Sequence, residues 1–206
     1  MKQIPRAVVV TMKKLEAFEK THDQSYLRAS LAKLRRGAGR SLESSPETWE
    51  LIFSDFSDSD FDNPRVFDND IEVPFTVLTL YAVHRQGGKI AHKKDFPLGR
   101  ALGVLRVRLG EDGSKSMTRR FDQLITAKSF SEIRQYARGL IQILRQNDLP
   151  FDYKKFANDI YWLNIGKKQI RQRVLRRWGR DYWTIDSEIK GADPLVDLKD
   201  KEDSSD

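Results

Sequence analysis

Apolar residues recur at helical spacing through much of this chain, and this periodicity limits the possible folds more than any other feature. In residues 131–146, SEIRQYARGLIQILRQ, the recurring apolar positions are Ile133, Tyr136, Ala137, Leu140, Ile141 and Leu144. Such a repeat gives an α-helix one apolar side. Helices of this kind fold by packing their apolar sides together. The sequence therefore predicts an all-α fold, a bundle of roughly eight or nine helices.

The same periodicity, together with the residues that usually start and end helices, locates the other helices. They are predicted at 25–36, 97–110 and 116–127, with one or two more over 152–183, and residues 74–84 favour a buried helix over a buried strand. Gly37 follows the first of them where a C-terminal cap is expected. Ser45 and Pro46 are typical of a helix start, Pro74 is placed at the head of its helix, and Ser116 is interpreted as an N-cap.

Charge is distributed unevenly along the chain. The formal net charge is +7, yet residues 184–206 carry eight acids and three lysines, and residues 50–72 carry eight acids and one arginine. We interpret residues 54–70 as an acidic loop, residues 184–206 as an acidic, disordered tail, and residues 1–183 as one helical domain of one lobe or two. The remainder of the chain is strongly basic, which is typical of a polyanion binder, although a basic surface can also serve solubility alone.

The strongest concentration of basic charge is RQRVLRRWGRDYW, residues 171–183, which has five arginines and no acid before Asp181. On a helix, Ile170, Val174 and Trp178 form a buried stripe. A second stripe beside it contains Arg173, Arg176, Arg177 and Arg180. Like charges at this spacing repel by a few tenths of a kcal/mol per pair, so an anionic partner would explain why they are tolerated. The alternative is that they suit the helix dipole and cover apolar surface.

Two arginine pairs are further candidates for phosphate binding. If Ser116 is an N-cap, Arg119 and Arg120 lie in the first turn and a half, where the helix dipole disfavours cations. Guanidinium groups beside free backbone amides are suited to phosphate, which is the favoured interpretation, and the alternative is that they bond loop carbonyls or nearby acids. Arg35 and Arg36 end their helix, where the dipole favours them, so a structural role there is equally plausible.

The remaining charged and aromatic residues favour structural roles. A solvated helix face is expected for Arg134, Arg138 and Arg145. A flexible loop that is either a mobile phosphate contact or simply solvated is expected for Lys89, Lys93 and Lys94. Base stacking is possible, but core packing is favoured, for Trp162, Trp178, Tyr182 and Trp183.

Catalytic chemistry has little support in the sequence. Cysteine is absent, so disulfides and thiolate metal sites are excluded, and His22, His84 and His92 have no ligand spacing. Asp58, Asp60 and Asp62 match the start of a calcium loop, but asparagines replace its required glycine and glutamate. We therefore predict no catalytic residue, no metal and no cofactor.

Nothing in the sequence predicts a membrane protein. The apolar run at residues 7–10 is far shorter than the roughly 20 residues that span a bilayer, and lysines follow it closely. Together with the absence of cysteine, this predicts a soluble, cytoplasmic protein.

Six segments, in order, resemble the CasB family, the small subunit of the type I-E CRISPR surveillance complex, Cascade. They are ASLAKLRRG (29–37), LYAVH (80–84), PLGRALG (97–103), RRFDQLITA (119–127), DLPFDYKKFANDIYWL (148–163) and WGRDYW (178–183). Each is weak alone, but their order and spacing together are specific, and the similarity covers about residues 21–183.

The resemblance implies an all-α, non-catalytic subunit that holds the guide–target heteroduplex and the displaced DNA strand. Its implied partners are the other Cascade subunits, a second copy of itself, CRISPR RNA and target DNA. It places the family's basic positions at Arg35, Arg36, Arg100, Arg119, Arg120, Lys167 and Lys168. To these the residues themselves add Arg171, Arg173 and Arg176 as nucleic-acid-binding candidates. The acidic loop and tail depart from the family, and the resemblance assigns them no role.

Two other function classes remain open from the sequence. A free-standing helical DNA-binding protein or regulator would need a compact helix-turn-helix, and none stands out. A nuclease using the acidic loop would need a second motif, and none is present.

Overall fold

A computed structural model describes residues 4–60, 62 and 64–185. These residues form nine α-helices and two short 3₁₀ segments, confirming the predicted all-α bundle. The helices are α1 (Arg6–Lys20), α2 (Gln24–Gly37), α3 (Trp49–Phe53), α4 (Pro64–His84), α5 (Leu98–Arg108), α6 (Gly110–Thr126), α7 (Phe130–Gln146), α8 (Tyr153–Ile165) and α9 (Lys168–Trp183). The predicted tail lies outside the described residues, apart from Thr184 and Ile185.

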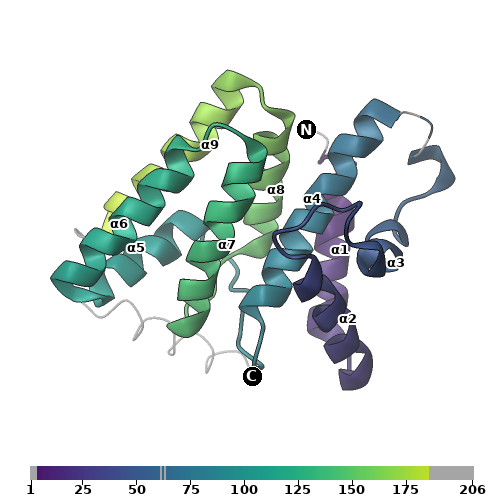
Figure 1. Ribbon diagram of the computed structural model, residues 1–206, viewed down its shortest axis with the longest axis horizontal. Helices are drawn as coiled ribbons and strands as arrows, with labels where there is room; N and C mark the ends of the chain where they lie inside the picture. Colours follow the sequence, from purple (N-terminus) through teal and green to yellow (C-terminus); the bar gives the residue numbers. More distant parts are fainter. Residues whose placement is uncertain (1–3, 61, 63, 186–206) are drawn as a thin grey trace.

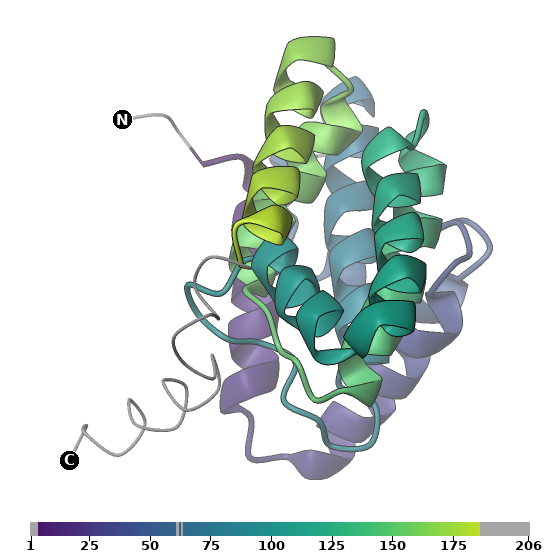
Figure 2. The ribbon, with the colours of Figure 1, turned by 90° about the vertical axis from the view of Figure 1, so that its left-hand side faces the viewer.

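Helix α4 runs through the middle of the molecule and joins its two sides. Helices α1 and α2 pack on one side of it and α7 and α8 on the other, while α5, α6 and α9 lie beyond (Figure 1). One cluster of buried apolar residues runs through the whole assembly, from Ala7 on α1 to Ile185 after α9. Figure 2 views the molecule from the end formed by α5, α6 and α9, the part that carries most of the candidate residues.

Local capping explains several helix ends. The hydroxyl of Ser129 accepts a hydrogen bond from the Glu132 amide while the Glu132 carboxylate accepts one from the Ser129 amide, which starts α7. Asp152 accepts from two amides at the start of α8. Gly166, at φ 72°, ends α8 in the left-handed conformation that glycine adopts most readily, and α9 follows two residues later.

Two helix starts differ from their predictions. α4 begins at Pro64 and continues through Pro74, so the predicted loop at 54–70 ends earlier than expected. The lost hydrogen bond at Pro74 is tolerated because the flanking residues, from Val73 to Val77, are buried between other helices. α6 begins at Gly110, with Glu111 and Asp112 in its first turn, so Ser116 lies inside the helix and is no N-cap.

Helix α1 was not predicted from the sequence, and the loop before α5 was predicted to be flexible. α1 buries Ala7, Val8, Val10, Leu15 and Phe18 in the core. The lysine-rich loop is held in place, because the Lys93 amide donates to the Phe151 carbonyl over 3.1 Å and the Phe151 amide donates to the Ala91 carbonyl over 3.1 Å.

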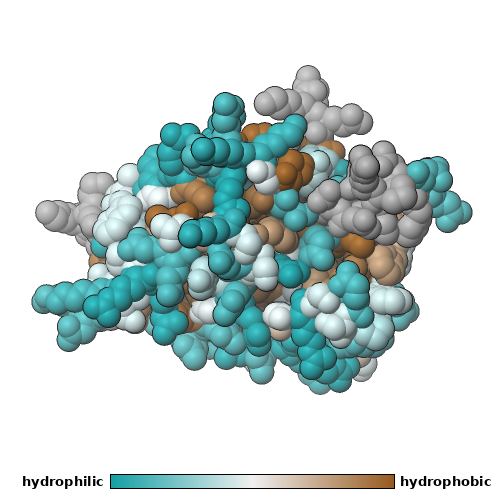
Figure 3. Space-filling model, turned by 45° about the horizontal axis from the view of Figure 1, so that its top comes forward, coloured by the Kyte–Doolittle hydropathy of each residue, from teal (hydrophilic) through white to brown (hydrophobic). Residues whose placement is uncertain are grey.

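Viewed from the top of the bundle as it stands in Figure 1, hydrophilic side chains cover most of the surface, and apolar residues show only in scattered patches (Figure 3). Among the described residues, no helix is long and apolar enough to cross a membrane.

Candidate nucleic-acid interface

The arginine stripe of α9 is divided by its surroundings. Arg177 donates to the Asp159 carboxylate, and Arg180 donates to Asp181 over 2.7 Å. The prediction that this stripe has no acidic neighbour is therefore wrong for half of it. Arg173 and Arg176 are exposed and form no ion pair with any described acid; the Arg176 Nε donates only to the Gln172 carbonyl in its own helix.

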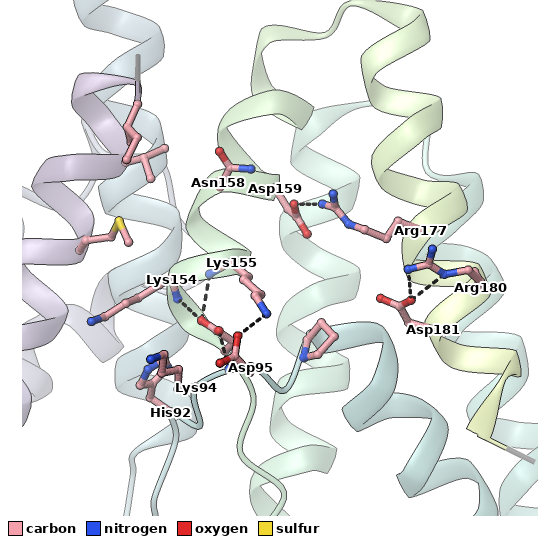
Figure 4. A pocket seen from close by; sticks show the side chains of 15 residues that line it. His92, Lys94, Asp95, Lys154, Lys155, Asn158, Asp159, Arg177, Arg180 and Asp181 are labelled. Atoms are coloured by element: carbon pink, nitrogen blue, oxygen red, sulfur yellow. Dashed lines mark hydrogen bonds and ion pairs between the residues drawn. The ribbon is translucent and has the colours of Figure 1, made fainter. Parts of the chain in front are cut away.

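The neutralised half of the stripe faces a cleft of about 640 Å³ between α1, α8, α9 and the loop before α5 (Figure 4). Two of its lysines are paired with acids on other elements. Lys155 contacts Asp95 at 2.7 Å, and Lys154 contacts Glu16 at 2.7 Å on α1. These lysines lower the pKa of both carboxyls, so the acids stay ionised and neutralise both lysines.

Asp159 is the structural centre of that cleft. It is buried, and it accepts hydrogen bonds from Arg177 and, over 2.7 Å, from the Trp178 indole. Burial raises its pKa, and the Arg177 charge offsets only part of that effect. The arrangement fixes α9 against α8 through a buried hydrogen bond, which is a packing role.

Helix α6 supplies the second set of cations. Because α6 starts at Gly110, Arg119 and Arg120 lie in its third turn, and the argument from an unfavourable dipole position is wrong. The two arginines are nevertheless exposed, and no described acid pairs with them. Met117, Phe121 and Leu124 anchor the helix from the opposite side.

Helices α6 and α9 run antiparallel beside each other. The hydroxyls of Thr118 and Tyr182 lie 3.0 Å apart, the Phe121 and Tyr182 rings stack at 3.9 Å, and Arg171 donates to the Ala127 carbonyl at the other end. Arg171 is thus partly committed to holding the two helices together. We call the outer surface of these helices the α6–α9 face. Its uncompensated cations are Arg119, Arg120, Lys168, Arg173 and Arg176.

Two predicted residues border this face. Lys167 is exposed in the turn before α9. Arg100 is half-buried on α5, which packs very closely against α9: a Cβ added at Gly99 would lie 2.5 Å from the Trp178 carbonyl. Arg100 makes an interaction within the protein, so it is less available than the exposed candidates.

The remaining predicted pair lies elsewhere. Arg35 and Arg36 end α2, which packs on the other side of α4 and is separated from the α6–α9 face (Figure 1). Arg36 is exposed and Arg35 half-buried, and neither forms an ion pair with a described acid. The structure therefore divides the ten candidates between two surfaces.

The arginines of α7 do not form the solvated face that was expected. Arg134 contacts Glu72 on α4 at 2.7 Å and lies over the Phe130 ring. Arg138 is half-buried against Gly39, and Arg145 donates to Gln86. These residues tie α7 to its neighbours. In the loop before α5, Lys89 pairs with Asp148.

Of the four aromatic residues considered for base stacking, Trp162, Trp178 and Tyr182 pack in or against the core, as predicted, and Trp183 does not. Trp178 and Tyr182 are buried, whereas Trp183 is 50% exposed. The Arg106 guanidinium lies 4.8 Å from the Trp183 ring and holds it at the end of the α6–α9 face. Sequence reasoning missed this exposed ring, although Trp183 falls outside the apolar stripe of Ile170, Val174 and Trp178.

Two titratable groups considered in the sequence, His84 and Asp60, make structural contacts. His84 is a core residue beside the Tyr153 hydroxyl, and burial lowers its pKa to about 4. Asp60 binds Arg6 and the Ser57 amide. No group of three or more metal-binding side chains is found among the described residues.

Comparisons with known proteins agree on one relationship. The family described as CRISPR-associated protein Cse2 matches residues 30–183. The crystal structure of CasB from Thermobifida fusca is 26% identical, with a TM-score of 0.63 over 85% of this chain and 94% of that chain. A Cse2-family protein from Thermus thermophilus is 20% identical, with a TM-score of 0.64 over 84% of this chain and 97% of that one, and shows the same fold. No curated protein sequence matches the chain.

Proposed function

The chain belongs to the CRISPR-associated Cse2 family, and from this premise we propose that it is a non-catalytic, nucleic-acid-binding subunit of a type I-E CRISPR surveillance complex. In that role it holds the guide–target heteroduplex and the displaced DNA strand through their backbones, together with other Cascade subunits and a second copy of itself. Base pairing supplies the sequence specificity in such complexes, so a backbone-holding subunit needs positive charge and no base-specific geometry.

One observation supports this proposal most directly: the cations of the α6–α9 face have no acidic partners among the described residues. Arg119 and Arg120 project from α6, and Arg173 and Arg176 from α9, while nearby cations in the cleft are neutralised. A phosphate backbone presents negative charge at regular intervals and releases counterions when it meets such a surface. The face is therefore where we place the main backbone contact.

The second surface, at Arg35 and Arg36 on α2, is proposed as a separate contact with another strand or another part of the same duplex. Helix α4 lies between α2 and the α6–α9 face, so the two surfaces can contact different strands. We treat residues 1–183 as the unit that carries both surfaces, and the acidic residues after it as an addition to that unit.

Binding should show the signature of phosphate contacts. We expect affinity for single-stranded DNA and RNA–DNA heteroduplex to fall steeply with salt, with a log–log slope of several units, and to vary little among random sequences. Electrophoretic shift or fluorescence anisotropy at several salt concentrations measures both. Flat salt dependence or strong sequence discrimination would contradict the proposal and favour a free-standing regulator.

The site assignment is tested with two matched double variants. Arg119→Ala with Arg120→Ala removes two uncompensated charges from the α6–α9 face, and binding should weaken by about 1–3 kcal/mol. Lys154→Ala with Lys155→Ala removes two charges that Glu16 and Asp95 already neutralise, so the loss should be small. Equal losses would mean that only total charge matters and that the face is misassigned.

The non-catalytic part of the proposal has its own measurement. Labelled single- and double-stranded substrates incubated with magnesium or manganese should stay intact. Cleavage that disappears on changing Asp58 and Asp60 would show a nuclease instead.

A further inference from the structure

A groove of about 530 Å³ lies between α6 and α9, within the α6–α9 face. Its floor is apolar: Ile125 of α6 and Leu175 of α9 are half-buried and pack on the core. Gly179 continues the floor one turn further, and a Cβ there would meet no atom within 4 Å. Gln172, Arg176 and Arg180 form the rim. The groove thus combines an apolar floor with guanidinium groups at its edge.

This combination is poorly suited to a nucleic-acid backbone alone, because phosphates and sugars gain little from an apolar floor. It is suited to a peptide that alternates aliphatic and acidic side chains, since each kind would meet its complement. Helix-flanked grooves recognise peptides through aliphatic anchors in this way.

The chain itself contains such a segment. Residues 186–206 hold eight acids and three lysines, and their main aliphatic cluster is DPLVDL, residues 193–198. Leu195, Val196 and Leu198 provide aliphatic anchors, and Asp193 and Asp197 provide the acids. The rest of the segment is polar and charged, so these six residues are its best match to the groove.

The segment also starts within reach. Ile185 is buried against α5, near Gly103, at the end of α9. Leu175 lies ten residues earlier on α9, about 15 Å away at the helical rise. Residues 186–194 can span up to about 30 Å when extended. The connection therefore allows DPLVDL to fold back along α9 into the groove.

We propose that residues 193–198 dock in the α6–α9 groove of the same chain and compete with nucleic acid for Arg176, the rim arginine that pairs with no described acid. The competition rests on the proposed function; the docking does not. A tethered segment has a millimolar effective concentration, so even weak contacts would occupy the groove until a longer polyanion displaces them. The acidic tail would thereby reject short or weakly bound anions.

The docking can be measured in the full-length chain without nucleic acid. The protein has no cysteine, so Ser204→Cys gives a single attachment point for a nitroxide spin label. We expect the label to broaden the amide NMR signals of α9 around the groove, from Gln172 to Gly179. Gly179→Leu, which adds bulk to the groove at a position where a Cβ meets no atom within 4 Å, and Leu195→Ser with Leu198→Ser, which removes the anchors at constant charge, should each restore those signals.

The docking would be overturned if the signals around the groove were not broadened, or if the broadening survived both sets of substitutions. It would also be overturned if a spin-labelled copy broadened the signals of a ¹⁵N-labelled, spin-free copy, because the docking would then occur between molecules. The matched control, Ile189→Ser with Ala192→Ser, changes the same tail outside the anchors and should leave the broadening intact.

The competition is tested separately. Adding single-stranded DNA should restore the groove signals, and Leu195→Ser with Leu198→Ser should raise DNA affinity about three- to tenfold, as expected when a tethered competitor is lost. Groove signals that stay broadened with DNA bound, or an affinity that does not change, would overturn the competition. A protein that binds no DNA at all would contradict the proposed function and leave the docking result unaffected.

Discussion

Two basic regions of this molecule, the cleft and the α6–α9 face, adjoin along α9 and use their cations differently, with Arg180 at the boundary of both. In the cleft, Lys155, Arg177 and Arg180 each contact a carboxylate (Figure 4), and Lys154 contacts Glu16 on α1. On the α6–α9 face the other exposed cations contact none of the described acids. Both regions are rich in lysine and arginine, so the residue types alone do not distinguish them. The difference shows that available charge, and not the number of cations, marks a surface for polyanions.

The largest expected effect comes from removing Asp159, the buried acid of the cleft. Asp159→Ala leaves the buried Trp178 indole without its acceptor and Arg177 without its partner, so we expect a stability loss of about 3 kcal/mol. Urea denaturation measures this loss, and DNA affinity of the folded protein should be unchanged. A loss below about 0.5 kcal/mol would show that the cleft does not hold α9 in place.

Acid should disturb the cleft side before the α6–α9 face. His84 lies at the end of α4 against Phe151 and Tyr153, which lead into α8 and its cleft lysines. Burial lowers its folded-state pKa from 6.5 to about 4. Its contribution is therefore complete above pH 6.5 and is lost as pH falls, by about 2 kcal/mol at pH 5.

Denaturation between pH 7 and pH 5 measures this effect. His84→Phe keeps the aromatic packing and should flatten the pH dependence of stability in that range. An unchanged pH dependence in the variant would assign the effect to other groups.

A smaller effect on DNA affinity distinguishes the free and the paired arginines within α9. Arg173→Ala with Arg176→Ala removes two uncompensated charges of α9, and Arg177→Ala with Arg180→Ala removes two compensated ones. The first pair should lower DNA affinity by about 1 kcal/mol and the salt slope by about two, with stability unchanged. The second pair should lower stability and affect binding less.

The reverse pattern, with the Arg177 and Arg180 variant binding more weakly, would place the nucleic acid in the cleft. Anisotropy titrations and urea denaturation on the same samples distinguish the two patterns.

The local sequence was sufficient to predict most of the helices. The apolar repeats of α2 and α7 and the acidic caps are interactions between residues a few positions apart, so they can be read directly from the chain. The helical class and the core positions of Trp178 and Tyr182 followed from the same periodicity.

Most of the helices, the excess of positive charge and the six segments that resemble the CasB family follow from the sequence alone. Which cations are free depends on the tertiary structure wherever the neutralising acid is distant in sequence: Lys154 contacts Glu16, and Arg177 contacts Asp159, whereas Asp181 follows Arg180 directly. The tertiary structure also decided that α6 starts at Gly110 and that α4 passes through Pro74, since packing against neighbouring helices outweighs a local cap or a local break. Ion pairs and helix packing join residues that no local pattern relates, and they separate the α6–α9 face from the cleft.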